Sequence, residues 1–214
     1  MKLKTTRKRT TKQPDVRRRE LMDAAIHVFA QKGISRSTVA DITKVAGVAK
    51  GTFYLYFTSK EHLLGALKER LVNEILDHAT ALYSRVGQED WESLLDATVE
   101  SMVDFFIDRK DMIYVMVQEG ATPETQDLFA ECELKVEQMF ATAIRVGIDQ
   151  GTFHASDPDM TGRLLNAALE GSLKNALLYG GGIDRDRFVA AAKEFVRKVL
   201  APPQVYKDGF FPGL

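Results

Sequence analysis

Residues 38–64 read TVADITKVAGVAKGTFYLYFTSKEHLL, and this stretch decides the fold of the N-terminal part of the chain. Its pattern predicts a short helix over about 38–46, a break at Gly47 and a second short helix over about 49–57. Thr38 stands where an N-cap residue belongs, and Asp41 follows at the spacing of a capping box. Two short helices joined at a glycine turn are typical of a helix-turn-helix.

The second short helix separates apolar from polar side chains. Phe53 and Phe57, four residues apart, are expected to pack inward, which turns Lys50 and Tyr54 outward. Lysine can contact phosphate or guanine, and hydroxyl groups can contact phosphate oxygens. The free N–H groups of the next helix, which starts near Lys60, also suit a phosphate. The residues predicted to contact DNA in this stretch are Thr38, Lys50, Gly51, Thr52, Tyr54, Tyr56 and Lys60. The alternative is a solvated face of a small helical domain.

Positive charge is concentrated in the first 60 residues. They contain 14 Lys and Arg against 4 Asp and Glu, whereas the remaining 154 residues contain 15 against 26. A basic segment joined to an acidic body indicates a part that binds a polyanion. Residues 1–14 are expected to form a flexible basic arm. Arg17 and Arg18 are expected to reach phosphates or the minor groove, although they would equally suit a charged first helical turn.

The stretch resembles the DNA-binding domain of the TetR family of bacterial regulators. The resemblance covers about residues 15–75 and rests on Ala24-Ala25, Phe29, Gly33, Ser37-Thr38, Ile42, Ala46-Gly47-Val48, Lys50 to Tyr54, Tyr56-Phe57, Ser59 to Glu61 and Leu63-Leu64. It implies a homodimer built on the last two long helices, a ligand pocket in the body, and release from operator DNA when a small molecule binds. Beyond residue 80 the resemblance is architectural only.

Helical spacing of apolar residues continues through the body and predicts an all-α fold of about nine helices. One helix follows Pro14, a long one starts at the capping-box pair Thr58 and Glu61, and others are expected over about 90–109, 111–119, 123–150, 157–179 and 183–200. The chain then divides into the arm (1–14), a DNA-binding head (15–75), a ligand-binding and dimerisation body (76–201) and an aromatic tail (202–214), whose role the sequence does not indicate.

Methionine and aromatic residues in the body indicate an adaptable apolar pocket, although at helical spacing each of them suits a packed core as well. Asn166 and Glu170, one turn apart in an otherwise apolar helix, could place polar groups there. The predicted pocket residues are Trp91, Met102, Phe106, Met112, Tyr114, Met116, Phe129, Met139, Phe140, Asn166 and Glu170.

The effector is expected to be mainly apolar, with a polar or cationic end. The cationic alternative rests on Glu119 and Glu170, because a buried carboxylate needs a partner. The rival is an acyl chain with a neutral or anionic head, served by basic residues of the body such as Arg109, Arg145 or Arg163.

The last two long helices carry more apolar surface than a single core requires. Their apolar repeats at three- and four-residue spacing suit helix packing across a two-fold axis. The residues predicted at this dimer interface are Leu165, Leu169, Leu173, Leu177, Phe188, Ala192, Phe195 and Val199.

Other functional classes have little support. The single cysteine, Cys132, excludes an intramolecular disulfide, and the four histidines show no ligand spacing, so no metal or cofactor is expected. No nucleophile motif or phosphate-binding loop indicates an enzyme. No membrane span or signal peptide is recognised, which favours a cytoplasmic protein. An architectural DNA-binding protein without a ligand stays open, as does an activator in place of a repressor.

Overall fold

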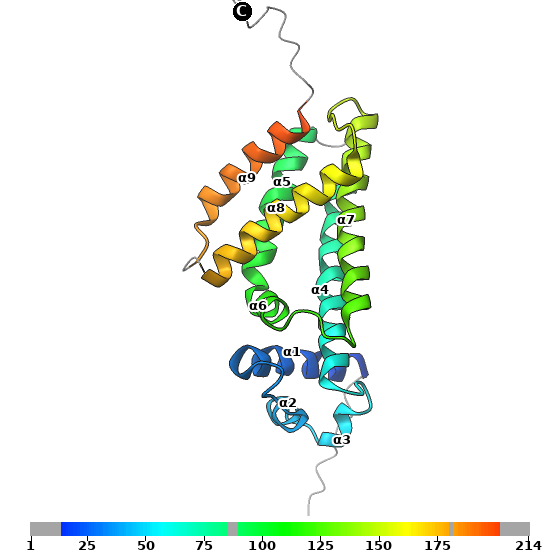
Figure 1. Ribbon diagram of the computed structural model, residues 1–214, viewed down its shortest axis with the longest axis vertical. Helices are drawn as coiled ribbons and strands as arrows, with labels where there is room; N and C mark the ends of the chain where they lie inside the picture. Colours follow the sequence, from blue (N-terminus) through cyan, green and yellow to red (C-terminus); the bar gives the residue numbers. More distant parts are fainter. Residues whose placement is uncertain (1–13, 85–89, 180–181, 202–214) are drawn as a thin grey trace, which may run out of the picture.

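The computed structural model describes residues 14–84, 90–179 and 182–201. Within these residues the fold is all-α, with nine helices and no strand, as the hydrophobic spacing predicted (Figure 1). The helices are α1 (Pro14–Lys32), α2 (Val39–Val45), α3 (Lys50–Phe53), α4 (Lys60–Tyr83), α5 (Trp91–Asp108), α6 (Lys110–Glu119), α7 (Gln126–Asp149), α8 (Pro158–Tyr179) and α9 (Arg185–Leu200). Residues 1–13 of the expected arm and the whole expected tail lie outside the described residues.

Side-chain caps determine where several helices begin. The Thr38 hydroxyl accepts a hydrogen bond from the backbone N–H of Asp41, and the Asp41 carboxylate accepts one from the N–H of Thr38, so the expected capping box is confirmed. The predicted capping box of α4 is wrong, because Ser59 and not Thr58 is the cap and accepts from the N–H of His62. The backbone N–H of Thr58 instead donates to Nδ1 of the His62 ring at 3.2 Å.

The helix α3 is shorter than the sequence predicted. It ends at Phe53, whose carbonyl accepts hydrogen bonds from the N–H groups of both Tyr56 and Phe57. Such mixed three- and four-residue spacing is common where a helix ends. The remaining residues of the expected helix therefore form a tight turn that leads into α4.

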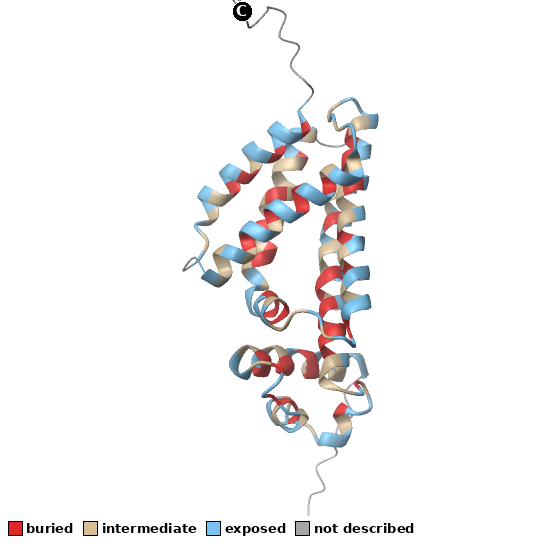
Figure 2. Cartoon of the chain, viewed as in Figure 1, coloured by how far each residue is buried: buried red, intermediate tan, exposed pale blue. Residues whose placement is uncertain are grey.

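The long helix α4 is shared by two groups of helices (Figure 1). Its first half packs with α1, α2 and α3 in the head, at the bottom of the view, and its second half joins α5 to α9 in the body. In the head, Leu21, Phe29, Ile42, Phe53 and Phe57 are each at most 2% exposed. Buried residues face the neighbouring helices throughout (Figure 2). Burying one large apolar side chain contributes about 1.5–3 kcal/mol, so this small head has a substantial core of its own.

The inward faces of α8 and α9 fill the body. Leu165, Leu169, Leu173 and Ala192 are at most 6% exposed. Three of them pack in one cluster with residues of α5 and α7, and Leu173 joins the core that continues into the head. Their prediction as dimer-interface residues is therefore wrong, because side chains buried within one subunit have no surface left for a second copy. Spacing along a helix identifies an apolar row but not which partner covers it.

The helices α7 and α8 cross closely at Gly162. A Cβ atom at this position would lie 2.9 Å from the backbone nitrogen of Ala141. Only glycine leaves room for such an approach of two backbones. The crossing fixes the position of α8 along the body, including Asn166 one turn further on.

Candidate functional site

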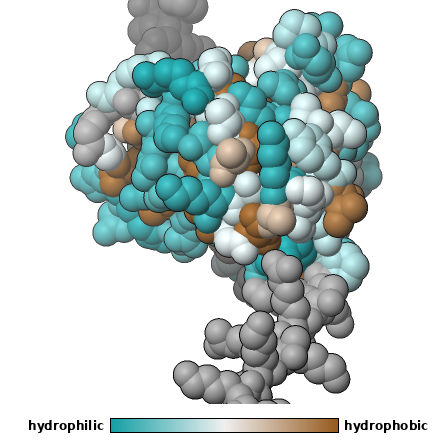
Figure 3. Space-filling model, turned by 90° about the horizontal axis from the view of Figure 1, so that it is seen from below, coloured by the Kyte–Doolittle hydropathy of each residue, from teal (hydrophilic) through white to brown (hydrophobic). Residues whose placement is uncertain are grey.

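The segment formed by α3 and the turn after it, residues 50–56, is exposed at the end of the head, and we call it the head face. The buried rings of Phe53 and Phe57, with centroids 5.6 Å apart, support it from within, as the sequence predicted. Tyr54 is 52% exposed and lies edge-on against Phe53. Among the other predicted contact residues, Lys50 and Gly51 are exposed, and Thr52 and Tyr56 are half-buried. Seen from below, this end of the molecule is largely hydrophilic, with scattered apolar residues (Figure 3).

One residue of the head face was missed by the sequence reasoning. Leu55 is 79% exposed, although it is a large aliphatic side chain. Apolar side chains can contact the methyl group of thymine in the major groove. The signal was present in the sequence, because inward packing of Phe53 and Phe57 leaves both Tyr54 and Leu55 outside.

Two predicted contact residues already have partners inside the head. The ammonium group of Lys60 donates to the backbone carbonyls of Ile34 and Ser37, each at 2.7 Å. The hydroxyl of Thr38 donates to the Asp41 carboxylate at 2.8 Å as part of the cap of α2. DNA contact by either residue stays a prediction, and it would have to coexist with these internal bonds.

The carboxylate of Asp41 is the centre of a small network at the start of α2. Hydrogen bonds from Lys32 and from Thr38 lower its pKa from 3.8 to about 2. Lys32, in the last turn of α1, lies 2.7 Å from Asp41. The network therefore fastens α2 to the end of α1.

The two arginines predicted to reach DNA lie in the first turns of α1. Arg17 forms an ion pair with Glu20 at 2.5 Å. The Arg18 guanidinium lies 5.3 Å from the centroid of the Phe57 ring, in cation–π geometry. Both side chains are half-buried, and their contact with DNA stays a prediction.

A joint between body and head lies at the end of α6. The backbone N–H of Ile34 donates to Glu119 Oε1 at 2.7 Å. Gly33, with φ of 72°, comes so close that a Cβ atom would lie 3.0 Å from the same oxygen. Because Lys60 holds the carbonyl of Ile34, this one residue is bound on both sides, by the body and by α4. Glu119 is thus occupied at the joint and is not among the residues that line the cavity.

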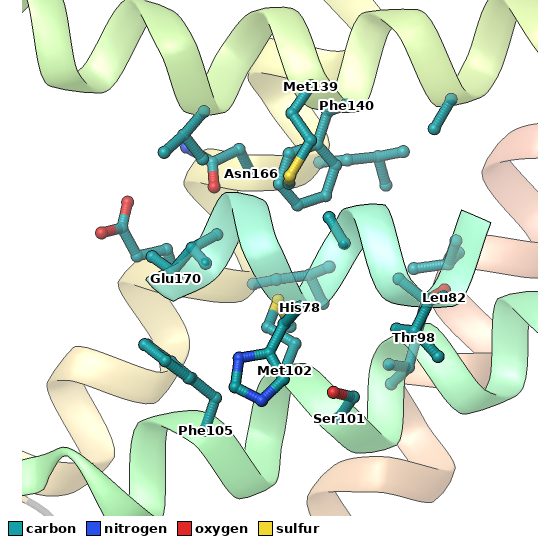
Figure 4. Close-up of a pocket in the computed structure, with 18 of the residues that line it drawn as sticks. His78, Leu82, Thr98, Ser101, Met102, Phe105, Met139, Phe140, Asn166 and Glu170 are labelled. Carbon is teal, nitrogen blue, oxygen red and sulfur yellow. The ribbon is translucent and has the colours of Figure 1, made fainter. Parts of the chain in front are cut away.

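A cavity of about 140 Å³ lies in the body, between α4, α5, α6, α7 and α8, with the end of α9 closing one side. Most of its lining is apolar (Figure 4). It includes eight of the predicted pocket residues: Trp91, Met102, Phe106, Met116, Met139, Phe140, Asn166 and Glu170. These eight residues therefore line one cavity, and its role as a ligand pocket stays a prediction.

Three predicted pocket residues lie elsewhere. Met112 is 3% exposed in the core, Tyr114 is 40% exposed at the surface, and Phe129 lies under the ammonium group of Lys68, 5.5 Å from its ring centroid. Conversely, the sequence reasoning named no pocket residue before Trp91 and missed the wall that α4 supplies. That wall consists of Lys68, Leu71, Val72, Ile75, His78, Ala79, Leu82 and Tyr83.

Four charged side chains line the cavity, and they form two ion pairs. Lys68 lies 2.5 Å from Glu133, and Lys174 lies 2.6 Å from Glu170. Glu170 was predicted as an anchor for a cationic ligand, but its charge is already matched. Burial raises the pKa of Tyr83 to about 12, so this phenol is uncharged at neutral pH.

Neutral polar groups in the cavity are few. Asn166 is 8% exposed, and its amide makes no hydrogen bond with any described residue. The Thr98 hydroxyl donates to the carbonyl of Leu94 at 2.8 Å, whereas the Ser101 hydroxyl has no partner in the described part of the chain. Nδ1 of His78 lies 3.0 Å from the carbonyl of Glu74.

The basic residues considered for an anionic ligand are also engaged elsewhere. Arg109 pairs with Glu74 and Arg163 with Glu137, and Arg145 pairs with Asp159. None of these three arginines lines the cavity.

The outer faces of α8 and α9 present apolar residues to solvent. Leu164 is 62% exposed, Phe195 is 42% exposed and Val199 is 38% exposed. Phe195 and Val199 were predicted at a dimer interface, and Leu164 lies on the row beside the one predicted. Phe188 and Leu177 are half-buried against the core of the same subunit.

Two other kinds of site have no candidate in the described part of the chain. Within residues 14–84, 90–179 and 182–201, His, Cys, Asp and Glu nowhere gather in a group of three that could hold a metal ion. None of the described helices combines the length and the apolarity needed to cross a membrane.

Comparison with known proteins links the two parts of the chain to one family. Residues 21–67 match the model of bacterial regulatory proteins of the tetR family, and residues 88–174 match the model of the tetracyclin repressor-like C-terminal domain. YvdT, an HTH-type transcriptional regulator of Bacillus subtilis, is 36% identical over 102 residues, which are 48% of this chain and 52% of YvdT. The chain spans about half the length of several curated relatives that it matches.

Two solved structures show the same fold. A TetR-family regulator from Syntrophomonas wolfei superposes with a TM-score of 0.78 at 19% identity, over 90% of this chain and 100% of that one. FadR from Bacillus subtilis, solved in complex with stearoyl-CoA, gives a TM-score of 0.70 at 19% identity, over 83% of this chain and 96% of that one. At such identities the likeness concerns the fold alone.

Proposed function

Because the chain belongs to the TetR family of bacterial regulators, we propose that it is a homodimeric repressor that leaves its operator DNA when a mainly apolar small molecule enters the body. The observation that carries this proposal is the placement of the cavity. Its walls include α4 and α6, and these two helices also hold Ile34 in the head, through Lys60 and Glu119. A ligand in the cavity therefore touches the elements that position the head face.

The head, residues 15–75, binds DNA in this proposal. The segment 49–57 enters the major groove, where Lys50 and Tyr54 contact phosphates or bases and Leu55 contacts a thymine methyl group. Helix-turn-helix proteins place their second helix in this way. The positive charge of the first 60 residues supports the assignment. The proposal places the protein in the cytoplasm, where the chromosome lies.

The body, residues 76–201, dimerises through the outer faces of α8 and α9. Leu164, Phe195 and Val199 give these faces an apolar centre that a second copy would cover. A two-fold dimer uses the same patch on both subunits. Two heads related by this axis require a pseudo-palindromic operator.

Release from DNA requires two states of the dimer and a ligand that prefers the state that does not bind DNA. A 100-fold loss of operator affinity corresponds to about 2.8 kcal/mol of coupling between the two sites. The joint at Ile34 connects the head to α6, one of the helices that line the cavity.

The DNA-binding part can be tested without knowing the operator. The purified chain is used to select bound duplexes from a random DNA pool, and the enriched sequences are read. We expect a pseudo-palindrome with half-site centres separated by about 34–36 Å or a multiple of it. On the selected duplex, Lys50→Ala combined with Tyr54→Ala should weaken binding at least about tenfold.

The matched control for this test is Lys135→Ala. Lys135 lies on α7, outside the head and outside the proposed interface on α8 and α9, and its side chain is 45% exposed. Its loss should leave DNA binding unchanged. Enrichment of one asymmetric half-site, or equal binding by the head-face variant and the control, would contradict the proposal.

A further inference from the structure

We propose that the cavity selects an uncharged ligand, and that the amide of Asn166 recognises it by pairing with a neutral hydrogen-bonding group such as a carboxamide, a ketone or a hydroxyl. This inference rests on the proposed function, because it assumes that the cavity is the effector site. It names the chemical class of that effector.

The first step is the state of Asn166. This side chain is more than nine-tenths buried, it lines the cavity, and it makes no hydrogen bond with any described residue. Figure 4 shows it beside Met139 and Phe140, on the side where Glu170 lies, with Met102 farther away across the pocket. An asparagine amide offers two donors and an acceptor. Among the described residues, every side-chain nitrogen or oxygen that is completely inaccessible has a hydrogen-bond partner, so the amide of Asn166, which has none, is open to the space of the cavity. In an apolar wall such an amide is best satisfied by a hydrogen-bonding group of whatever occupies the cavity.

The second step is the charge of the cavity. Lys68 with Glu133, and Lys174 with Glu170, contribute two positive and two negative charges that neutralise each other. A charged head group would have to compete with these pairs. A cation that bound Glu133 would leave Lys68, whose side chain is 9% exposed, without its partner, and an anion that bound Lys174 would leave Glu170, 22% exposed, in the same state. The cavity therefore disfavours a cation as well as an anion.

The third step is the shape of the remaining surface. Beside Asn166 the wall is formed by Met139 and Phe140, and Met102 and Phe105 line the opposite side of the pocket (Figure 4). The volume of about 140 Å³ is close to that of an engineered apolar cavity of about 150 Å³ that binds benzene. A compact apolar body with one aromatic ring fits this space. The hydroxyl of Ser101, which has no partner among the described residues, offers a second neutral hydrogen-bonding group to a substituent.

The chain carries its own reporter for a binding experiment. Trp91 is the only tryptophan in the sequence and lines the cavity. Its fluorescence is titrated with four probes that share a phenylpropyl body: 3-phenylpropanamide, 3-phenylpropanoate, 3-phenylpropylamine and propylbenzene. We expect the amide to bind at least about tenfold more tightly than the carboxylate or the ammonium compound, because a charged group loses more hydration on entering the cavity.

Variants at Asn166 separate recognition from packing. Asn166→Leu should weaken the binding of 3-phenylpropanamide by about 5- to 10-fold, which corresponds to the loss of one neutral hydrogen bond. The affinity for propylbenzene should stay unchanged. Asn166→Asp should reverse the order and favour the ammonium compound over the amide. The matched control is Asn73→Leu, at an exposed position of α4 that does not line the cavity, and it should bind all four probes as the parent does.

Three results would overturn the inference. If the parent protein binds a charged probe more tightly than 3-phenylpropanamide, the ion pairs of the cavity separate to accommodate a charged group. If Asn166→Leu lowers the affinities for 3-phenylpropanamide and for propylbenzene equally, Asn166 has a packing role only. If none of the four probes binds while the DNA selection succeeds, the cavity assignment fails and the DNA-binding proposal stands.

Discussion

At the scale of single residues, Lys50 and Lys60 differ in what their ammonium groups already bind. Lys50 is exposed, whereas Lys60 donates to two carbonyls of the head. Lys50→Ala should therefore flatten the plot of log K for DNA against log salt by about 0.9 for each phosphate that is no longer neutralised, without a change in thermal unfolding. Lys60→Met should lower the free energy of unfolding by about 1–3 kcal/mol, because both carbonyls lose their donor.

These two variants are compared by salt titration of DNA binding and by thermal unfolding. If Lys60 also contacts a phosphate, as its position suggested, its variant will show the flatter slope in addition to the loss of stability. A Lys60 variant with a flatter slope and unchanged stability would contradict the internal role.

The residue Asp41 gives a prediction for pH. Its pKa is lowered to about 2 by Lys32 and Thr38, so the folded state holds the ionised form more strongly than the unfolded chain does. The resulting stabilisation is complete above about pH 4 and disappears as the pH falls toward 2. Asp41→Asn should lower the unfolding temperature at neutral pH, and its difference from the parent should vanish near pH 2. A difference that stays constant over this range would exclude the network as its cause.

At the scale of elements, α6 connects the cavity to the head. Glu119→Ala removes the acceptor of the Ile34 N–H, so hydrogen exchange at the Ile34 amide should become faster. Glu119→Gln keeps an oxygen at this position and should restore much of the protection. The exposed neighbour Gln118→Ala is the control. Unchanged exchange in Glu119→Ala would mean that the joint is held by other contacts.

Sequence patterns predicted helices better than they predicted what each helix face touches. The helix expected over 90–109 is found as Trp91–Asp108, because apolar spacing and the cap at Asp90 are local properties. The wall that α4 gives to the cavity was not predicted, since a stripe such as Ile75, Ala79 and Leu82 reads the same whether it faces a filled core or a space. Likewise, Leu165, Leu169 and Leu173 form an apolar row that packs in the core of their own subunit.

The candidate site was predictable where a local motif defines it. The head face follows from the spacing of Phe53 and Phe57, which fixes the outward residues. The joint between Glu119 and Ile34 joins residues 85 positions apart in the chain, and no local pattern signals such a contact.

At the scale of the whole molecule, the outer faces of α8 and α9 decide the oligomeric state. Leu164→Asp, at the most exposed of their large aliphatic side chains, should convert the dimer to a monomer in analytical ultracentrifugation, because an unpaired charge would enter the interface. Phe195→Asp should have the same effect. Leu134→Asp, at a position of α7 that is 50% exposed, is the matched control and should stay dimeric. A dimeric Leu164→Asp variant would place the interface elsewhere.

The continuity of α4 has a mechanical consequence. Its 24 residues form one rod of about 36 Å, with one end in the core of the head and the other along the cavity. On such a lever arm, a tilt of about 5° at the upper end displaces the lower end by about 3 Å. This displacement approaches the spacing of neighbouring base pairs, about 3.4 Å. A ligand therefore needs to tilt α4 only slightly to move the two heads out of register with the DNA groove. Of two ligands, the bulkier one should displace the lower end of α4 further.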